Sequence, residues 1–262
     1  MSSLLVELQG RVALLTLNRP DALNALDPPL GQALAHEIQR AAEDPGIGAI
    51  VITGAGRAFC SGGDIAFMKS VFDQGGRYED FEPLVGGGPG VVRAIETCAK
   101  PVIAAVNGAA AGGGMSLALV CDVRWASERA RFGQSFVRIG LHPDWGSIHA
   151  LPRLVGQARA LELMWTGDLI DAAEALRIGI VTRVLPEADL IPKTIDFAAR
   201  LADGPAVALA EIKRSVRASL GYTLDQALDR ELEAQKRCWN TRDAREGITA
   251  FLEKREPRYE GR

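Results

Sequence analysis

The chain has 262 residues, of which 47% are hydrophobic and 24% charged, as is usual for a soluble globular protein. Its net charge of −3 at pH 7 gives no basic excess that would indicate a nucleic-acid partner. No apolar run approaches the roughly 20 residues that a membrane helix needs, and no basic segment followed by an apolar one marks a signal peptide. We therefore expect a cytoplasmic protein with neither a nucleic-acid nor a membrane partner.

The cysteines and histidines give no pattern of a disulfide or a metal site. The four cysteines show no CxxC spacing, which is typical of reduced thiols in an intracellular protein. The three histidines lie too far apart in the sequence to suggest a zinc cluster. We expect no bound metal.

The first elements are a hairpin and a helix. Leu4–Leu8 and Arg11–Leu17 are β-prone runs, and Gln9-Gly10 between them predicts a tight turn. Asp27-Pro28 predicts the start of a helix, since Asp caps helices and Pro suits their first turn. One face of this helix is apolar, with Leu30, Leu34, Ile38 and Ala41.

A strand, a glycine loop and a helix follow. Ala49–Thr53 predicts a buried strand, Gly54–Gly63 a loop of small residues, and Asp64 the start of a helix. The next segment, Phe67–Gly90, is rich in glycine and poorly patterned. We expect a mobile loop or a broken helix there, of the kind that often serves as a lid, followed by a helix over Pro89–Thr97.

A second unit has the same layout. Pro101–Val106 predicts a strand, and Gly112–Gly114 open an apolar helix that ends near Cys121. Glycine allows close approach of a ligand to the backbone, and the first N–H groups of a helix lack internal partners and lie at the positive end of its dipole. If the two units lie side by side, one N–H from each can hold a single carbonyl oxygen, as in an oxyanion hole.

The second half of the chain alternates strands and helices and then becomes helical. Strands are predicted at Val123–Ala126, Ala130–Gly133 and Ile180–Leu185, and helices at Ile148–Leu154, Ala158–Thr166 and Asp171–Leu176. Beyond Pro186 the pattern is helical, with breaks at residues 203–205 and 220–222. This order predicts an α/β fold with a C-terminal helical region.

Several motifs, taken in order, resemble those of the crotonase, or enoyl-CoA hydratase/isomerase, superfamily. They are Asn18-Arg19-Pro20, Asn24-Ala25-Leu26, Ala58 to Ile65, Lys100-Pro101, Asn107-Gly108, Gly112–Gly114, Phe132-Gly133-Gln134 and Ala250 to Arg255. The resemblance implies a crotonase-like ββα spiral carrying an acyl-CoA site over residues 1–200 and a helical trimerisation region over 201–262. It also implies an acyl-CoA thioester substrate, no cofactor apart from the coenzyme A of that substrate, and a homotrimer or a dimer of trimers.

The resemblance also implies which residues form the site. The oxyanion hole would consist of the N–H groups of Gly63 and Gly113. Coenzyme A would lie along backbone near the first motifs, at Ala22, Leu23, Ala25, Ser61, Gly63, Asp64 and Ile65. For Asp64 the sequence favours a helix cap. Phe251 and Lys254 match tail residues that reach coenzyme A, often in a neighbouring subunit, although Lys254 could equally be an exposed helix lysine.

Two family positions lack their usual carboxylate. Hydratases of the family activate water with two glutamates, and the corresponding positions here are Ser116 and Phe136. A serine hydroxyl is hardly basic near neutral pH, and phenylalanine carries no titratable group. Hydration with two glutamates is therefore disfavoured.

A carboxylate does occur at Asp144, where some isomerases and dehalogenases of the superfamily carry an aspartate. In the isomerases it moves a proton between the α and γ carbons, and in the dehalogenases it attacks an aromatic ring. Burial beside Trp145 would raise its pKa toward a useful range, and His142 and Arg138 could tune it. Alternatively, Asp144 caps the following helix. Trp145 and Trp165 are expected in the pocket wall or the core.

We favour an enoyl-CoA isomerase in which Asp144 carries the proton. A hydratase, a hydrolytic or dehalogenating member of the superfamily, and a non-catalytic acyl-CoA binder remain as alternatives. A nicotinamide enzyme is weakly supported because Gly54 to Phe59 lacks the third glycine of GxGxxG. A serine hydrolase is weakly supported because Ser116 only half matches GxSxG.

Overall fold

The computed structural model describes residues 2–261 and contains two β-sheets. The larger sheet has the strand order β1 (Leu4–Gln9), β2 (Val12–Leu17), β3 (Ala49–Gly54), β5 (Val102–Val106), β7 (Val123–Ser127) and β10 (Arg183–Leu185). The smaller has the order β4 (Ala58–Cys60), β6 (Ala109–Ala111), β8 (Arg131–Gly133) and β9 (Ile170–Asp171). β1 and β2 form the predicted antiparallel hairpin, while β2, β3, β5, β7 and β10 run parallel.

Successive strands of the two sheets alternate along the chain. β3, β5 and β7 of the larger sheet are each followed directly by β4, β6 and β8 of the smaller one, and helices follow each pair. This repeat is the ββα spiral that the sequence predicted. Neither β6 nor β4 was predicted, and β4 lies within Gly54–Gly63, which was predicted to be a loop. The two strands pair, and this pairing places the glycine loops that follow them side by side.

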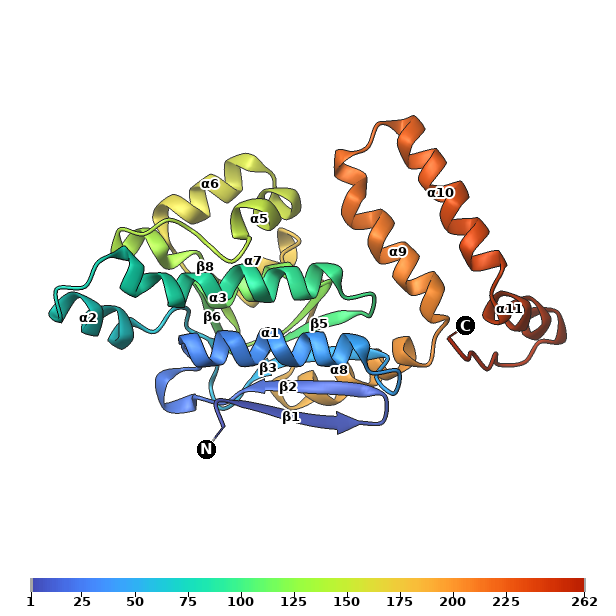
Figure 1. The fold of residues 1–262 in the computed structure, drawn as a ribbon, viewed down its shortest axis with the longest axis horizontal. Coiled ribbons are helices and arrows are strands. Elements are labelled where there is room, and N and C mark those ends of the chain that lie inside the picture. Colours follow the sequence, from blue (N-terminus) through green and yellow to red (C-terminus); the bar gives the residue numbers. More distant parts are fainter. Residues whose placement is uncertain (1, 262) are drawn as a thin grey trace.

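Helices cover both faces of the larger sheet (Figure 1). One face packs against α1 (Pro28–Glu43), α3 (Tyr78–Thr97) and α4 (Gly113–Val120), and the other against α8 (Glu187–Ala202). Strand residues divide between the two faces with period two. The cap of α1 was predicted correctly, since Asp27 Oδ1 accepts a hydrogen bond from Leu30 N at 2.9 Å.

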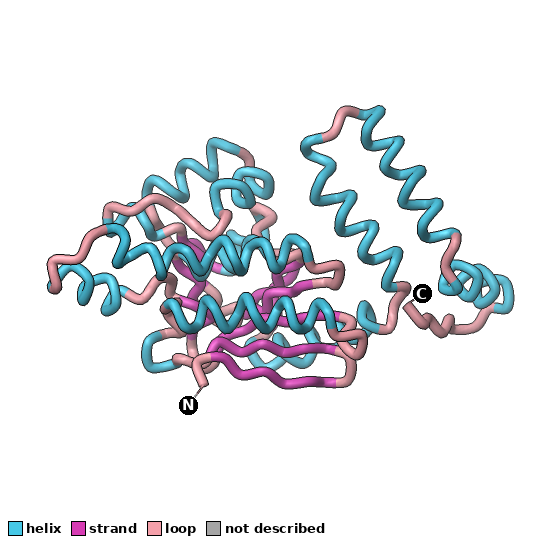
Figure 2. The backbone as a smooth tube through the Cα atoms, viewed as in Figure 1, coloured by secondary structure: helices cyan, strands magenta, loops and turns pink. Residues whose placement is uncertain are grey.

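The remaining helices lie around the smaller sheet and in the C-terminal region (Figure 2). They are α2 (Ile65–Asp73), α5 (Ser147–Val155), α6 (Gln157–Thr166), α7 (Ala172–Arg177), α9 (Ala206–Ala218), α10 (Leu224–Trp239) and α11 (Arg242–Glu253), with 3₁₀ helices at Pro20–Ala22, Ser135–Ile139 and Ser219–Gly221. None of the helices within residues 2–261 combines the length and apolar character that crossing a bilayer requires.

Of the two alternatives predicted for Phe67–Gly90, the broken helix is confirmed and the loop is wrong. The chain is broken only near Gly75, between α2 and α3, and α3 begins at Tyr78 rather than near Pro89. The glycines of α3 serve close packing instead: a Cβ added at Gly31 of α1 would lie 3.6 Å from Gly87 Cα. Packing of α3 on α1 therefore overrides the weak helix propensity of glycine.

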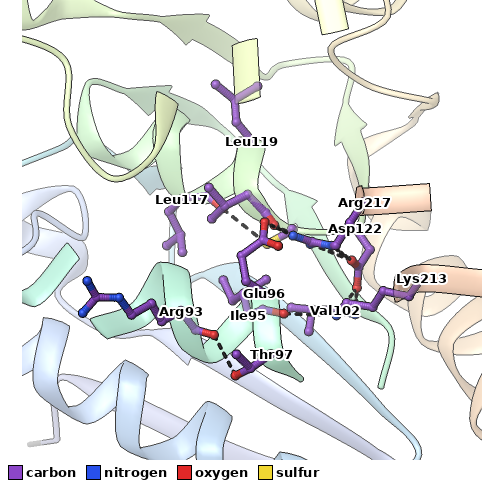
Figure 3. A network of polar contacts seen from close by, with 12 residues as sticks. Arg93, Ile95, Glu96, Thr97, Val102, Leu117, Leu119, Asp122, Lys213 and Arg217 are labelled. Atoms are coloured by element: carbon purple, nitrogen blue, oxygen red, sulfur yellow. Dashed lines mark hydrogen bonds and ion pairs between the residues drawn. The ribbon is translucent and has the colours of Figure 1, made fainter. Parts of the chain in front are cut away.

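Helices α9, α10 and α11 extend away from the sheets (Figure 1). Asp122, in the short link between α4 and β7, connects α9 to the body of the protein (Figure 3). Its carboxylate pairs with Lys213 Nζ at 2.8 Å and Arg217 Nη2 at 2.7 Å, and accepts a hydrogen bond from Val102 N at 2.8 Å. Arg217 also donates to Val120 O at 2.9 Å. The C-terminal region is thus attached at the C-terminal end of α4.

Candidate active site between two glycine loops

The first glycine loop follows β4 and is held by the segment around Leu26. Leu26 N donates to Gly62 O at 2.7 Å, and Asp64 N donates to Leu26 O at 2.9 Å. Gly62 has a φ of +103°, and a Cβ there would lie 2.9 Å from Ala111 O. Glycine is required at this position by both the backbone angle and the space.

The second loop leads from β6 into α4. Gly112 has a φ of +50°, donates to Gly133 O at 2.8 Å, and is followed by Gly113 as the first residue of the helix. The two loops lie against each other, since a Cβ at Gly62 would be 3.4 Å from Gly113 N. The predicted juxtaposition of the two strand–loop–helix units is therefore present.

A cavity of about 250 Å³ opens between the loops, and both Gly63 and Gly113 line it. Within residues 2–261, neither N–H donates a hydrogen bond to another group. Gly113 stands at the N-terminus of α4, where the helix dipole adds partial positive charge. Two free donors beside one cavity can bind an oxygen that gains negative charge.

Asp144 lines the same cavity and is the only carboxylate among the described residues that do. A Cβ added at Gly113 would lie 3.9 Å from Asp144 Oδ1. This oxygen is buried and has no hydrogen-bond partner within residues 2–261. Burial raises the pKa of Asp144 to about 6, although its own N–H and His142 act in the opposite direction.

The alternative that Asp144 caps the following helix is wrong. The N-cap of α5 is Gly146, with a φ of +77° and no side chain bonded to the helix. Asp144 contributes only its main-chain oxygen, which accepts hydrogen bonds from Ser147 N at 3.1 Å and Ser147 Oγ at 3.0 Å. Its carboxylate is left free to act in the cavity.

Neither of the two positions that hold a glutamate in hydratases of the family carries a basic side chain in this structure. Ser116 is buried in α4, and its hydroxyl donates to Gly112 O at 3.1 Å. Phe136 is buried and forms part of the cavity wall. Neither side chain can therefore take the place of a glutamate base at this cavity.

Asp64 caps α2, as predicted. Its Oδ1 accepts from Ala66 N at 2.9 Å and Phe67 N at 3.1 Å, and its Oδ2 pairs with Arg19 Nη2 at 2.7 Å. Burial acts to raise the pKa of Asp64, but the Arg19 guanidinium and the two N–H groups outweigh it, so the pKa is lowered. Asp64 fixes the first loop and does not itself line the cavity.

The other residues expected to bind coenzyme A fall into two groups. Ala22, Leu23 and Ala25 lie beside Ser61, whose N donates to Leu23 O at 3.0 Å, and Ile65 is exposed at the mouth of the cavity. Phe251 and Lys254 instead lie in and just after α11, at the opposite end of the molecule from α2 (Figure 1). Phe251 is 84% exposed. A single chain does not bring this tail to the cavity.

Sequence reasoning missed Asn24 as an individual residue. It is fully buried, and its amide donates to Ala55 O at 2.9 Å and Ala58 O at 2.8 Å and accepts from Arg19 N at 2.9 Å. It thereby joins the segment before α1 to the turn between β3 and β4. Its occurrence in the motif Asn24-Ala25-Leu26 was the available signal.

Three neighbouring side chains differ in their roles. Trp145 is only 5% exposed and lines the cavity, as expected, whereas Trp165 is 70% exposed and the prediction for it was wrong. Arg138 lines the cavity but pairs with Asp168 at 2.7 Å. Within residues 2–261, the Arg138 guanidinium is therefore paired with Asp168 and not with Asp144.

A second, apolar cavity of about 530 Å³ adjoins the first, between α2 and the start of α3. The two cavities share five lining side chains, Ile65, Met68, Phe81, Ile139 and Leu141. The segment that was predicted as a mobile loop or a broken helix thus provides a helical apolar wall.

Known proteins resemble this chain along its whole length. A family model described as enoyl-CoA hydratase/isomerase matches residues 7–262. A crotonyl-CoA hydratase of Syntrophomonas wolfei is 38% identical over 258 residues, which is 98% of this chain and 97% of that protein. A short-chain-enoyl-CoA hydratase of Clostridium acetobutylicum is 39% identical over 256 residues, 97% of this chain and 96% of that protein. The crystal structure of an enoyl-CoA hydratase from a Polaromonas species matches with a TM-score of 0.93 at 35% identity, covering 98% of this chain and 100% of that one.

Proposed function

Because the chain belongs to the enoyl-CoA hydratase/isomerase family, we propose that it shifts the double bond of an enoyl-CoA thioester through an enolate. The observation that carries this proposal is the single carboxylate of the cavity: Asp144 has one buried, unpartnered oxygen and adjoins Gly113. One carboxylate is sufficient for a reaction whose net result is the transfer of one proton between two carbons.

The steps follow from the chemistry of a 3-enoyl thioester. Its carbonyl oxygen accepts hydrogen bonds from the N–H groups of Gly63 and Gly113. The Asp144 carboxylate removes a proton from the α carbon, and the electron pair moves onto the thioester oxygen, where the two donors stabilise the charge. Protonated Asp144 then returns the proton to the γ carbon, which leaves a 2-enoyl thioester. A carboxylate whose pKa is about 6 is ionised at neutral pH and more basic than an ordinary aspartate.

Hydration is the second candidate, and the names of the relatives favour it. The proteins from Syntrophomonas wolfei and Clostridium acetobutylicum are both named hydratases. Hydration requires two tasks, activation of water and protonation of the α carbon. Asp144 would have to perform both, because it is the one carboxylate among the described residues that line the cavity. Ser116 and Phe136 occupy the positions of the two glutamates.

Product analysis separates the two candidates. A matched pair of 2-enoyl- and 3-enoyl-CoA esters is incubated with the protein, and products are resolved by chromatography and mass spectrometry. We expect migration of the double bond without change of mass, at least about 100-fold faster than addition of water, a difference of roughly 2.7 kcal/mol in activation free energy. Faster hydration than migration would replace the proposal by the second candidate. Binding of both esters without conversion would instead indicate a non-catalytic acyl-CoA binder.

The two adjoining cavities lead to a prediction about the acyl group. The second cavity is lined mainly by apolar side chains of α2 and α3, and burial of one methylene group contributes about 0.8 kcal/mol. We expect kcat/KM to rise by about tenfold or more from four-carbon to eight-carbon enoyl-CoA substrates. Val71 lines only the second cavity, so Val71→Trp should reduce the rate with the longer ester and spare the shorter one. Equal rates across chain lengths would contradict an acyl group that enters this cavity.

We also propose that residues 201–262 join copies of the chain into a trimer or a dimer of trimers. Large apolar side chains are exposed along α9, α10 and α11, among them Ile212, Val216, Leu232, Trp239 and Phe251. Apolar surface of this extent is typical of a protein interface. Light scattering after size exclusion should give three or six times the chain mass of 28.0 kDa, and Leu232→Asp should lower it. A monomer at micromolar concentration would contradict the proposal.

A further inference from the structure

The residue after Asp144 has an unusual backbone conformation. Trp145 has a φ of +51° and is followed by Gly146 with a φ of +77°. Among the non-glycine residues in 2–261, only Leu23, Asn24 and Lys254 share a positive φ. A bulky side chain disfavours this region, so the conformation persists only where the surroundings fix it.

The surroundings of Trp145 form a slot made by two glycines, one from α1 and one from α3. A Cβ added at Gly88 of α3 would lie 2.5 Å from Trp145 Cδ1 and 2.6 Å from Nε1. A Cβ added at Gly31 of α1 would lie 4.0 Å from Cζ2 and Cη2. The space that these glycines leave is therefore filled by the indole, and Gly88 admits no side chain while the ring is in place. We call this space the indole slot.

The turn that carries the indole also carries the carboxylate. Ser147, which is buried, bonds back to Asp144 O through both its N–H and its hydroxyl, which closes the turn around Trp145 and Gly146. Within this closed turn, the direction of the Asp144 side chain depends on the backbone angles of Trp145. Those angles are in turn fixed by the ring in the indole slot.

We infer that Trp145 is a positioning residue: its indole, held between Gly31 and Gly88, keeps the Asp144 carboxylate buried beside Gly113. The catalytic consequence rests on the proposed function, whereas the effect on the position and burial of Asp144 does not. The other titratable groups near this carboxylate are His142 on the same loop and Arg138 from the 3₁₀ helix Ser135–Ile139, whose guanidinium pairs with Asp168.

Two alanine substitutions within α3 provide a matched test. Gly88→Ala places a methyl group where the indole lies, whereas Gly86→Ala meets no atom within 4 Å. Both replace a helical glycine by alanine and gain the same helix propensity. We expect Gly88→Ala to lower kcat at least tenfold with KM changed less than about threefold, because a displaced catalytic group loses rate more than affinity. Gly86→Ala should behave as the wild type.

A readout without turnover follows Asp144 directly. Carbon-13 NMR of labelled aspartate carboxyl groups, assigned with Asp144→Asn, should show Asp144 titrating near a pH of about 6 in the wild type and in Gly86→Ala. In Gly88→Ala the midpoint should fall toward the ordinary value of 3.8, since a displaced carboxylate gains contact with solvent. The smaller ring in the double variant Gly88→Ala/Trp145→Phe should leave room for the methyl group and recover several-fold of the lost rate.

The outcomes are separable. Identical kcat and titration midpoints for Gly88→Ala and Gly86→Ala would overturn the positioning role. If Gly88→Ala does not fold, Trp145→Ala, which leaves the indole slot without a ring, decides alone: an unchanged Asp144 midpoint overturns the inference, and a lowered midpoint supports it. If Asp144→Asn retains full activity while Gly88→Ala still shifts the Asp144 titration, the proposed function fails and the positioning role stands.

Discussion

Asp144→Asn is expected to lower kcat for double-bond migration by about 10²- to 10⁴-fold, the range of general acid–base catalysis. The amide has nearly the shape of the carboxylate but cannot accept the α proton. KM should change little, because the lost contribution arises in the transition state. Steady-state kinetics with a 3-enoyl-CoA ester measures both constants. Retention of more than a tenth of the wild-type kcat would exclude Asp144 as the base.

The same substitution is expected to stabilise the fold at high pH. In the folded protein the pKa of Asp144 is raised to about 6 by burial, from an ordinary 3.8. The charged form is therefore penalised only in the folded state: the wild type loses stability as pH rises between these two values and bears the full penalty above about pH 6. Asparagine carries no charge, so Asp144→Asn should be more stable by about 1–3 kcal/mol at pH 8, with no such gain below about pH 4. Urea unfolding at the two pH values tests this, and equal stability at pH 8 would contradict it.

Gly113→Pro is expected to lower kcat by about 10²- to 10³-fold, which is typical of losing one oxyanion-hole donor. Proline removes the N–H of a residue that lines the cavity. The fold should tolerate it, because Gly113 is the first residue of α4, where proline is favoured, and its N–H has no partner within residues 2–261.

Gly113→Ala is the matched control for that substitution. It adds a carbon at the same place, 3.2 Å from Leu26 Cδ1, and keeps the N–H. We expect it to lose much less activity than the proline variant, and the difference in kcat measures the contribution of the donor. Equal losses in the two variants would mean that crowding of the cavity, and not the N–H, accounts for the effect.

Local signals in the sequence were sufficient for much of the fold. The hairpin, the Asp27 cap of α1 and the two strand–loop–helix units depend on residues close together in the chain. The short strand β6 was missed because Ala109–Ala111 shows no alternation of apolar and polar residues. The glycines of α3 indicated a loop because their partners, Gly31 and Trp145, lie far away in the sequence.

The candidate site was predictable in its parts but not in its assembly. Motifs of the family were sufficient to select Gly63, Gly113 and Asp144 as site residues. Asp144 does not cap α5 because two consecutive residues with positive φ, Trp145 and Gly146, separate it from the helix. A sequence pattern does not reveal these backbone angles. The adjoining apolar cavity likewise depends on α2 and α3 being helices, since their side chains line it.

The most direct test of the account is deuterium uptake from deuterated water into a saturated acyl-CoA and a 3-enoyl-CoA ester. Enolate formation at the two glycine loops, with Asp144 as the base, predicts deuterium at the α carbon of the saturated ester. For the 3-enoyl ester it predicts a migrated product whose new γ hydrogen comes from the α carbon, except where protonated Asp144 exchanges with solvent before the transfer. Both the exchange and the migration should be lost in Asp144→Asn. Exchange or migration at wild-type rates in Asp144→Asn would contradict the account, since another group would then carry the proton.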